Sequence, residues 1–181
     1  GIMTTDTYPK AISCSVGNST LTVVGKGSGM IEPNMATMLV YIFTDAKIDS
    51  ASLDSLLRKA VNKTFNMLSV DTDTSTSDTC VIMANGKAGE VDEDEFYTAL
   101  EACCIRMTEM LARDGEGATK LLKVNISGAL NNKEAISYAK SMINSPLIKT
   151  MAFGADPNIG RILMALGKCF DNSFDLKKLK F

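Results

Sequence analysis

The sequence contains no histidine, and this absence excludes more chemistry than any other feature of its composition. A chain without histidine has neither a Ser-His-Asp nor a Cys-His catalytic arrangement. It also lacks the commonest metal ligand of proteins. A catalytic site in this chain must therefore take its general base from another kind of group.

Long apolar runs and an excess of basic residues are missing too. The longest apolar run, residues 38–43, is far shorter than the roughly 20 residues of a membrane-spanning helix. The first residues lack the basic and then apolar pattern of a signal peptide. A net charge of -2 gives no attraction to nucleic acid or to an anionic membrane. We therefore expect a cytoplasmic protein that binds neither nucleic acid nor membrane.

Cysteines are few, and none is spaced as Cys-x-x-Cys. The five cysteines are odd in number and include an adjacent pair at positions 103 and 104, so we expect reduced and mostly buried thiols. The 181 residues are 45% hydrophobic and 22% charged, which is ordinary for a globular chain. This length predicts a single domain over residues 1–181.

The remaining pattern alternates between strands and helices. Apolar residues recur at helical spacing, behind a cluster of Asp49, Ser50 and Ser52 that suits capping in one segment and with acidic residues in the first turn of another. The predicted helices are 52–67, 92–113, 133–143 and 159–166, and the predicted strands are 21–26, 38–44, 78–84, 119–127 and 174–181. Such a mixture indicates an α/β or α+β fold, in which a mixed β-sheet and helices form a layered sandwich.

A glycine-rich segment, residues 25–39, joins two of these strands. Its glycines suggest a phosphate-binding loop, but neither Gly-x-x-x-x-Gly-Lys-Ser/Thr nor Gly-x-Gly-x-x-Gly is present. By composition alone, a flexible connection between strands is the favoured interpretation. However, Thr37 directly precedes an apolar strand, and a threonine in that place has a specific chemical use.

Cleavage between Ala36 and Thr37 would give Thr37 a free α-amine. Such an amine has a pKa of about 8, so it can accept the proton of the threonine's own hydroxyl near neutral pH. The same hydroxyl can perform the cleavage, because its attack on the Ala36 carbonyl converts the peptide into an ester that water opens. One residue would then serve processing and catalysis without any histidine.

Several segments match the pattern of one known family, in order and over nearly the whole chain. They are MTTDT at 3–7, GKGSGMI at 25–31, PNMATML at 33–39, SVDTDTSTSDT at 69–79, LARDGEGATK at 111–120 and FGADPNIGRIL at 153–163. On these segments the chain resembles the ornithine acetyltransferases, also called glutamate N-acetyltransferases. The resemblance implies a self-processing fold of N-terminal-nucleophile type.

The resemblance also implies a reaction and its residues. Thr37 would accept the acetyl group after cleavage at Ala36–Thr37, and Thr4, Lys26 and Glu116 would line the substrate site together with it. The family moves an acetyl group from N2-acetylornithine to glutamate through an acetyl-threonine in arginine biosynthesis, and some members also use acetyl-CoA. No cofactor is implied. Family members assemble from both halves of the chain and oligomerise, so we expect an oligomer.

Each of these residues also has a simpler interpretation. A lysine beside glycines is more often solvated than functional. Glu116 between two glycines is typical of the end of a helix, and Thr4 lies near a chain end, where disorder is common. The spacing of Asp71, Asp73 and Ser75 suggests an EF-hand, but Thr76 and Ile82 occupy its glycine and glutamate positions. We therefore predict no metal site, and expect these side chains to bond turn backbone groups.

Two functional segments of the family lie outside residues 1–181: the Thr-Gly pair of the oxyanion hole, upstream, and substrate-binding residues of the C-terminal tail. We therefore expect these residues alone to carry the nucleophile without activity, because the loss of an oxyanion donor costs about a hundredfold or more in rate. The alternatives are a self-processing amidohydrolase or aminopeptidase, which transfers the acyl group to water, and a non-catalytic fragment of the transferase.

Overall fold

The computed structural model describes residues 1–32, 38–169 and 180. The chain divides into two compact units, Gly1–Thr119 and Lys120–Phe181. The expectation of a single domain over residues 1–181 stays a prediction, because compact units can belong to one cooperative domain or to two.

The first unit is built on a four-stranded sheet whose strands lie in chain order. They are β1 (Lys10–Val16), β2 (Ser19–Lys26), β3 (Leu39–Lys47) and β4 (Thr79–Glu90). β1 and β2 form an antiparallel hairpin, and the first residue of its two-residue turn, Gly17, has a φ of 54°, in the left-handed region that favours glycine. β2 pairs with β3 antiparallel, whereas β3 and β4 run parallel.

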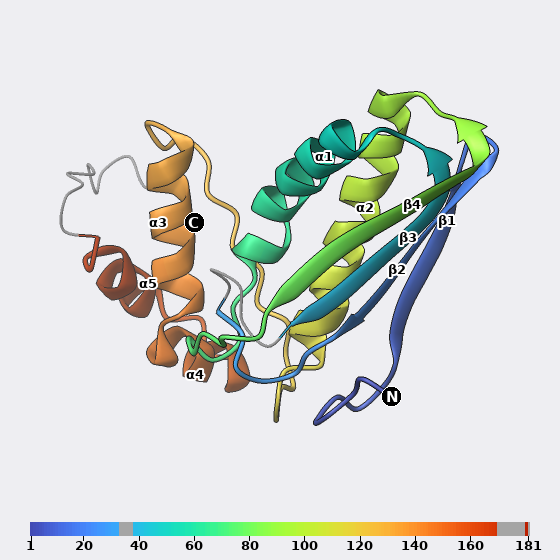
Figure 1. Ribbon diagram of the computed structural model, residues 1–181. Helices are drawn as coiled ribbons and strands as arrows, with labels where there is room; N and C mark the ends of the chain where they lie inside the picture. The colour runs from blue at the N-terminus through green and yellow to red at the C-terminus, as the bar shows by residue number, and fades with distance from the viewer. Residues whose placement is uncertain (33–37, 170–179, 181) are drawn as a thin grey trace. The chain divides into compact units, whose positions relative to one another are not determined.

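Two helices pack on one face of this sheet (Figure 1). They are α1 (Ser50–Lys63) and α2 (Glu93–Arg113), and a short 3-10 turn, η1 (Phe65–Met67), follows α1. α1 crosses from the end of β3 toward the start of β4, as a parallel strand pair requires. The side chains of Asp49 and Asp92 cap the two helices by accepting from main-chain N–H groups of the first turn. Both helices were predicted, although α1 ends at Lys63 and the 3-10 turn replaces its expected last turn.

The core lies between the sheet and these helices. Alternate residues of the two central strands and the apolar stripe of α2 belong to this core, and both sets are fully buried: Leu21, Val23, Val40, Ile42, Phe96, Leu100, Met107 and Leu111. The opposite face of the sheet carries half-exposed side chains, including Phe43 and Met83. This mixed sheet with helices confirms the predicted α/β layered fold.

The second unit contains three helices in its described residues: α3 (Asn132–Ile143), α4 (Pro146–Phe153) and α5 (Ile159–Leu166). Asn131, Ser145 and Asn158 cap them in turn. Arg161 donates to the Leu147 carbonyl oxygen at 3.0 Å.

Three features differ from the sequence-based expectations. Residues 119–127, predicted as a strand, form neither helix nor strand. Alternation makes a strand only when a neighbouring strand supplies hydrogen bonds, and no described strand pairs with this segment. β1 and α4 were not predicted. The expected strand at 174–181 lies outside the described residues, apart from residue 180. None of the helices in the described ranges has the length and apolar character that crossing a membrane requires.

Candidate functional site

Lys26 is the last residue of β2, and its register partner is Leu39, the first residue of β3. The residue is only 5% exposed, and its Nζ donates to Thr4 Oγ1 at 3.1 Å. Among the described residues, its ammonium group forms no ion pair. A buried ammonium without a counter-charge is costly. Lys26 is therefore well suited to meet an anionic group of a ligand.

Glu116 lies just beyond the end of α2, where three contacts hold it beside the loop that follows β2. Its main-chain N–H donates to the Ser28 carbonyl oxygen at 2.8 Å. Its Oε1 accepts from Thr5 Oγ1 at 2.7 Å. The carboxylate lies against Gly29, where an added Cβ would be 2.7 Å from Oε1. Glu116 itself is exposed, so it can meet a cationic group of a ligand.

Residues 4–7 connect these two side chains to the rest of the first unit. Four consecutive side chains each contact a different residue: Thr4 with Lys26, Thr5 with Glu116, Asp6 with Lys10, and Thr7 with Asp114. Consecutive Cα atoms are only about 3.8 Å apart. The structure therefore brings together three of the predicted site residues, Thr4, Lys26 and Glu116, through residues 4 and 5.

Beneath this segment lies a buried charge cluster formed by Lys10, Asp6 and Asp114. Lys10 Nζ is 2.7 Å from Asp6 Oδ1 and 2.5 Å from Asp114 Oδ2, and the three side chains are between 0% and 3% exposed. Asp6 also accepts from the N–H groups of Gly27 and Thr4, at 2.8 and 3.2 Å. The cluster thus fixes the start of the chain, the loop after β2 and the end of α2 relative to one another.

The pKa values of this cluster favour its charged form. Burial by itself would raise the pKa of Asp6, but hydrogen bonds from Lys10, Gly27 and Thr4 outweigh it and lower the pKa to about 2. The pKa of Asp114 is lowered for the same reason, because Lys10 and Thr7 more than offset its burial. Burial would lower the pKa of Lys10, yet its two carboxylate partners raise it. All three groups are therefore charged at neutral pH.

The predicted bonding of residues 71–78 to turn backbone groups is present. Asp71 Oδ2 accepts from Met30 N–H at 2.6 Å and its Oδ1 accepts from Ile31 N–H at 2.9 Å. Met30 has a φ of 55°, which is rare for a residue with a side chain. Asp71 therefore fixes the chain just before residues 33–37.

Asp78 holds the chain on the other side of these residues. Its Oδ1 accepts from Met38 N–H at 2.8 Å, while its Oδ2 is buried and has no hydrogen-bond partner among the described residues. Burial raises the pKa of Asp78, and the N–H of Met38 only partly opposes this. Ala36 and Thr37, the predicted cleavage site and nucleophile, lie outside the described residues.

Sequence reasoning did not identify Thr5, Ser28 or the buried cluster as part of this site. A signal for Lys10 existed, because the inward-facing positions of β1 alternate and Lys10 occupies the first of them. A lysine at an inward position requires a buried partner. Nothing local indicated that the partner would be Asp114, which is 104 residues away.

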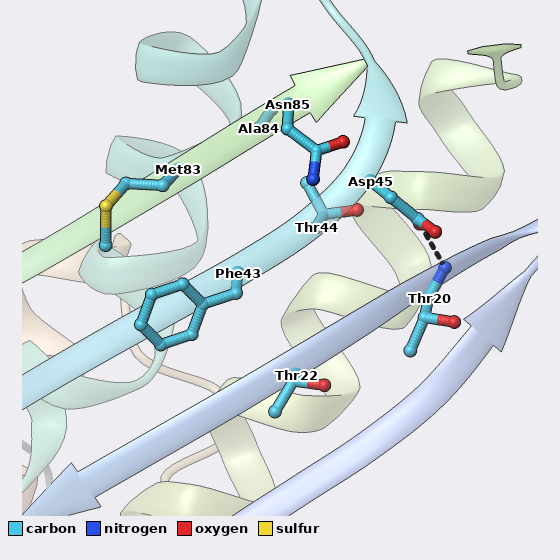
Figure 2. A pocket seen from close by; sticks show the side chains of 8 residues that line it. All are labelled: Thr20, Thr22, Phe43, Thr44, Asp45, Met83, Ala84 and Asn85. Atoms are coloured by element: carbon cyan, nitrogen blue, oxygen red, sulfur yellow. Dashed lines mark hydrogen bonds between the residues drawn. The ribbon is translucent and has the colours of Figure 1, made fainter. Parts of the chain in front are cut away.

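A pocket lies elsewhere, on the open face of the sheet (Figure 2). It is lined by Thr20, Thr22, Phe43, Thr44, Asp45, Met83, Ala84 and Asn85. Its single carboxylate, Asp45, accepts from Thr20 N–H at 2.7 Å. None of the predicted site residues lines this pocket, so the candidate site is the group formed around residues 4–7, 26–29 and 114–116.

The cysteines agree in part with the expectation of reduced and mostly buried thiols, because Cys103 and Cys104 are buried and the other three are partly buried. All five are free, and none is exposed. Burial raises the pKa of Cys80 to about 12, and burial together with neighbouring Cys14 raises that of Cys103 to about 12. Such thiols are protonated at neutral pH and are poor nucleophiles.

Comparison with known proteins gives a consistent result. The ArgJ family matches residues 1–181. The chain is 55% identical over 171 residues to the arginine biosynthesis bifunctional protein ArgJ 2 of a Nostoc species, covering 94% of this chain and 44% of that protein. It is 49% identical over 175 residues to the glutamate N-acetyltransferase of Methanocaldococcus jannaschii, covering 92% of this chain and 44% of that protein.

A solved structure is similar as well. The crystal structure of the arginine biosynthesis bifunctional protein ArgJ from Bacillus halodurans aligns with a TM-score of 0.69 and 45% identity, covering 72% of this chain and 65% of that one. The chain spans less than half the length of the curated relatives described above. Because the family match extends over residues 1–181 and the relatives are this similar, the chain belongs to the ArgJ family.

Proposed function

We propose that the protein that contains this chain transfers the acetyl group of N2-acetyl-L-ornithine to L-glutamate, as a step of arginine biosynthesis. The observation that carries this proposal is that one site holds two side chains of opposite charge, neither of which forms an ion pair among the described residues. Lys26 is a buried ammonium with no ion pair among the described residues, and Glu116 is an exposed carboxylate with one oxygen held by Thr5. An amino acid substrate carries the two complementary charges.

The proposed roles follow from this arrangement. Lys26, held by Thr4, would bind a substrate carboxylate, and Glu116 would bind the amine of ornithine. Thr37 would be the nucleophile. It follows Ala36 at the proposed cleavage site and precedes Leu39, the register partner of Lys26, by two residues. The names of relatives, which include glutamate N-acetyltransferase, support the same chemistry.

The proposed reaction has three stages. The Thr37 hydroxyl attacks the Ala36 carbonyl carbon, and water opens the resulting ester, which leaves Thr37 with a free α-amine. That amine then takes the hydroxyl proton while the oxygen attacks the acetyl carbonyl of acetylornithine, and ornithine leaves with a proton. Finally the amine of glutamate attacks the acetyl-threonine, and acetylglutamate leaves. Acetyl-CoA is a further candidate donor for the second stage.

The test uses the protein at its natural length, with Thr37→Ala and Thr37→Ser variants. Intact mass should give two pieces for the parent and one for Thr37→Ala, which lacks the attacking oxygen. With acetylornithine alone, the piece that begins at Thr37 should gain the mass of one acetyl group. Adding glutamate should remove that group as acetylglutamate.

Three outcomes would contradict the proposal. An uncut Thr37→Ala variant beside an uncut parent would remove Thr37 as a processing residue. Acetate formed in preference to acetylglutamate would indicate the hydrolase alternative. Cleavage without any acetyl transfer would leave a self-processing protein of another activity. Thr37→Ser, which keeps a hydroxyl, should retain part of the cleavage.

A further inference from the structure

Thr5 contacts Glu116, and its neighbour Thr4 contacts Lys26, yet neither the family resemblance nor the sequence pattern assigned Thr5 a role. Its hydroxyl has two described contacts, with Glu116 Oε1 at 2.7 Å and with Ser28 Oγ at 3.1 Å. Thr5 and Glu116 are both exposed, whereas Ser28 is only 2% exposed. An exposed hydroxyl that bonds an exposed carboxylate contributes little to folding, so its position calls for another explanation.

The direction of these hydrogen bonds follows from the donors available. A hydroxyl group has a single proton, and a carboxylate only accepts. Thr5 gives its proton to Glu116, so its oxygen can only accept from Ser28. Ser28 therefore donates to Thr5, Thr5 donates to Glu116, and the N–H of Glu116 donates back to the Ser28 carbonyl at 2.8 Å. The three residues form a closed ring of hydrogen bonds.

The ring restrains the carboxylate of Glu116 at one of its two oxygens. Oε1 is bonded to Thr5 and lies against Gly29, where a Cβ would be 2.7 Å away. Oε2 has no hydrogen bond within the part of the chain that the structure describes. Because a charge-assisted bond to an amine depends on where the acceptor oxygen points, fixing Oε1 also fixes the oxygen that faces a ligand.

We propose that Thr5 is a positioning residue of the substrate site, whose hydroxyl orients Glu116 so that its second oxygen receives the amine of the acetyl donor. This inference rests on the proposed function. It adds a residue that discriminates donors by their side-chain amine, because an acetylated amino acid without that amine gains nothing from an oriented carboxylate.

Four variants of the natural-length protein test it: Thr5→Val, Thr5→Ser, Ser28→Ala and Thr22→Val. Thr5→Val keeps the shape of the side chain but removes the hydroxyl. Thr22→Val is the matched control, because Thr22 also forms a hydroxyl pair on an exposed surface, with Ser13 at 2.8 Å, but contacts no carboxylate of the described residues. The measurements are kcat and KM for acetylornithine, the heat of L-ornithine binding, and Tm.

We expect Thr5→Val to raise the KM for acetylornithine and the Kd for ornithine roughly tenfold, with kcat within about twofold and Tm unchanged. Thr5→Ser should restore both constants to near the parent values. Ser28→Ala should give a smaller rise, because Ser28 reaches the carboxylate only through Thr5, and Thr22→Val should change neither constant.

Other results would overturn the inference. An active parent with an unchanged KM in Thr5→Val would leave the proposed function standing and remove Thr5 from it. A loss of Tm and kcat with KM unchanged, not restored in Thr5→Ser, would make the ring purely structural. A parent that neither transfers acetyl nor binds ornithine would overturn both proposals together.

Discussion

Gly25 and Gly29 show that the effect of adding a side chain at a glycine depends on the residue that it would meet. A Cβ added to either would be 2.7 Å from a side-chain atom, which is Met107 Sδ for Gly25 and Glu116 Oε1 for Gly29. Met107 is fully buried in the core, whereas Glu116 is exposed. An added methyl group at Gly25 therefore meets a side chain that the core confines, whereas one at Gly29 meets a side chain that can move into solvent.

This difference predicts separate effects for the two alanine variants. Gly25→Ala should lower the free energy of unfolding by about 1–3 kcal/mol, because the core must shift to accept it. Gly29→Ala should change that free energy by less than about 0.5 kcal/mol, but it should weaken ornithine binding by displacing Glu116. Urea denaturation and calorimetric titration of both variants check this. A Gly29→Ala variant with parental ornithine affinity would speak against Glu116 as the amine-binding group.

At the scale of elements, α2 connects the core to the candidate site. Its buried stripe, which includes Phe96, Leu100 and Met107, packs on the sheet. Its C-terminal end leads directly to Asp114 in the buried cluster and to Glu116 in the hydrogen-bonded ring. The packing of this one helix therefore determines where Asp114 and Glu116 of the LARDGEGATK segment lie.

Two truncations on α2 should separate packing from exposed surface. Leu100→Ala removes a fully buried side chain and should lower the free energy of unfolding by about 2–5 kcal/mol. Ile105→Ala, on the same helix but 49% exposed, should change it by no more than about 0.5 kcal/mol. Urea denaturation followed by circular dichroism measures both. Equal losses for the two variants would mean that α2 does not pack as described.

At the scale of the whole first unit, the buried cluster joins the start of the chain to the residue after α2. Lys10 lies at the start of β1, Asp6 precedes it by four residues, and Asp114 follows α2. Removal of one member of a buried ion pair leaves an uncompensated charge, which typically costs about 3–5 kcal/mol. The cluster therefore stabilises the fold only while all three groups keep their charges.

This requirement predicts a loss of stability in acid. The pKa of Asp6 is about 2 in the folded chain and about 4 in an unfolded one. Its contribution is therefore present above about pH 4 and is lost as the pH falls through about 2, by about 2 kcal/mol in total. The raised pKa of Lys10 acts at the other end of the scale, because its contribution is lost only as the pH rises through that value.

Urea denaturation between about pH 7 and pH 2 measures this effect. The Asp6→Asn variant is the control, since it cannot be protonated and should show a smaller decrease over the same range. If the parent and the variant lost stability in parallel, carboxylates other than Asp6 would account for the acid dependence.

The sequence predicted those parts of the fold that depend on near neighbours. Helices α1 and α2 follow from apolar spacing, from the capping residue Asp49 and from the acidic first turn of α2, because a helix forms between residues three or four apart. The strand at 21–26 and the start of β4 follow from similar local patterns. The sequence also named Thr4, Lys26 and Glu116, although only through their resemblance to a family, and the role of Thr37 stays a prediction.

Tertiary structure alone decided which of these segments pair and which distant residues come into contact. The segment at 119–127 has the alternation of a strand but no described strand to pair with, whereas β1 gains its partner through a hairpin turn. Thr5 meets Glu116 across 111 residues, and Lys10 meets Asp114 across 104. Local patterns specify helices and strands because their hydrogen bonds and apolar faces repeat over a few residues. The contacts that build the site join residues with no such repeat, so they exist only once the chain has packed.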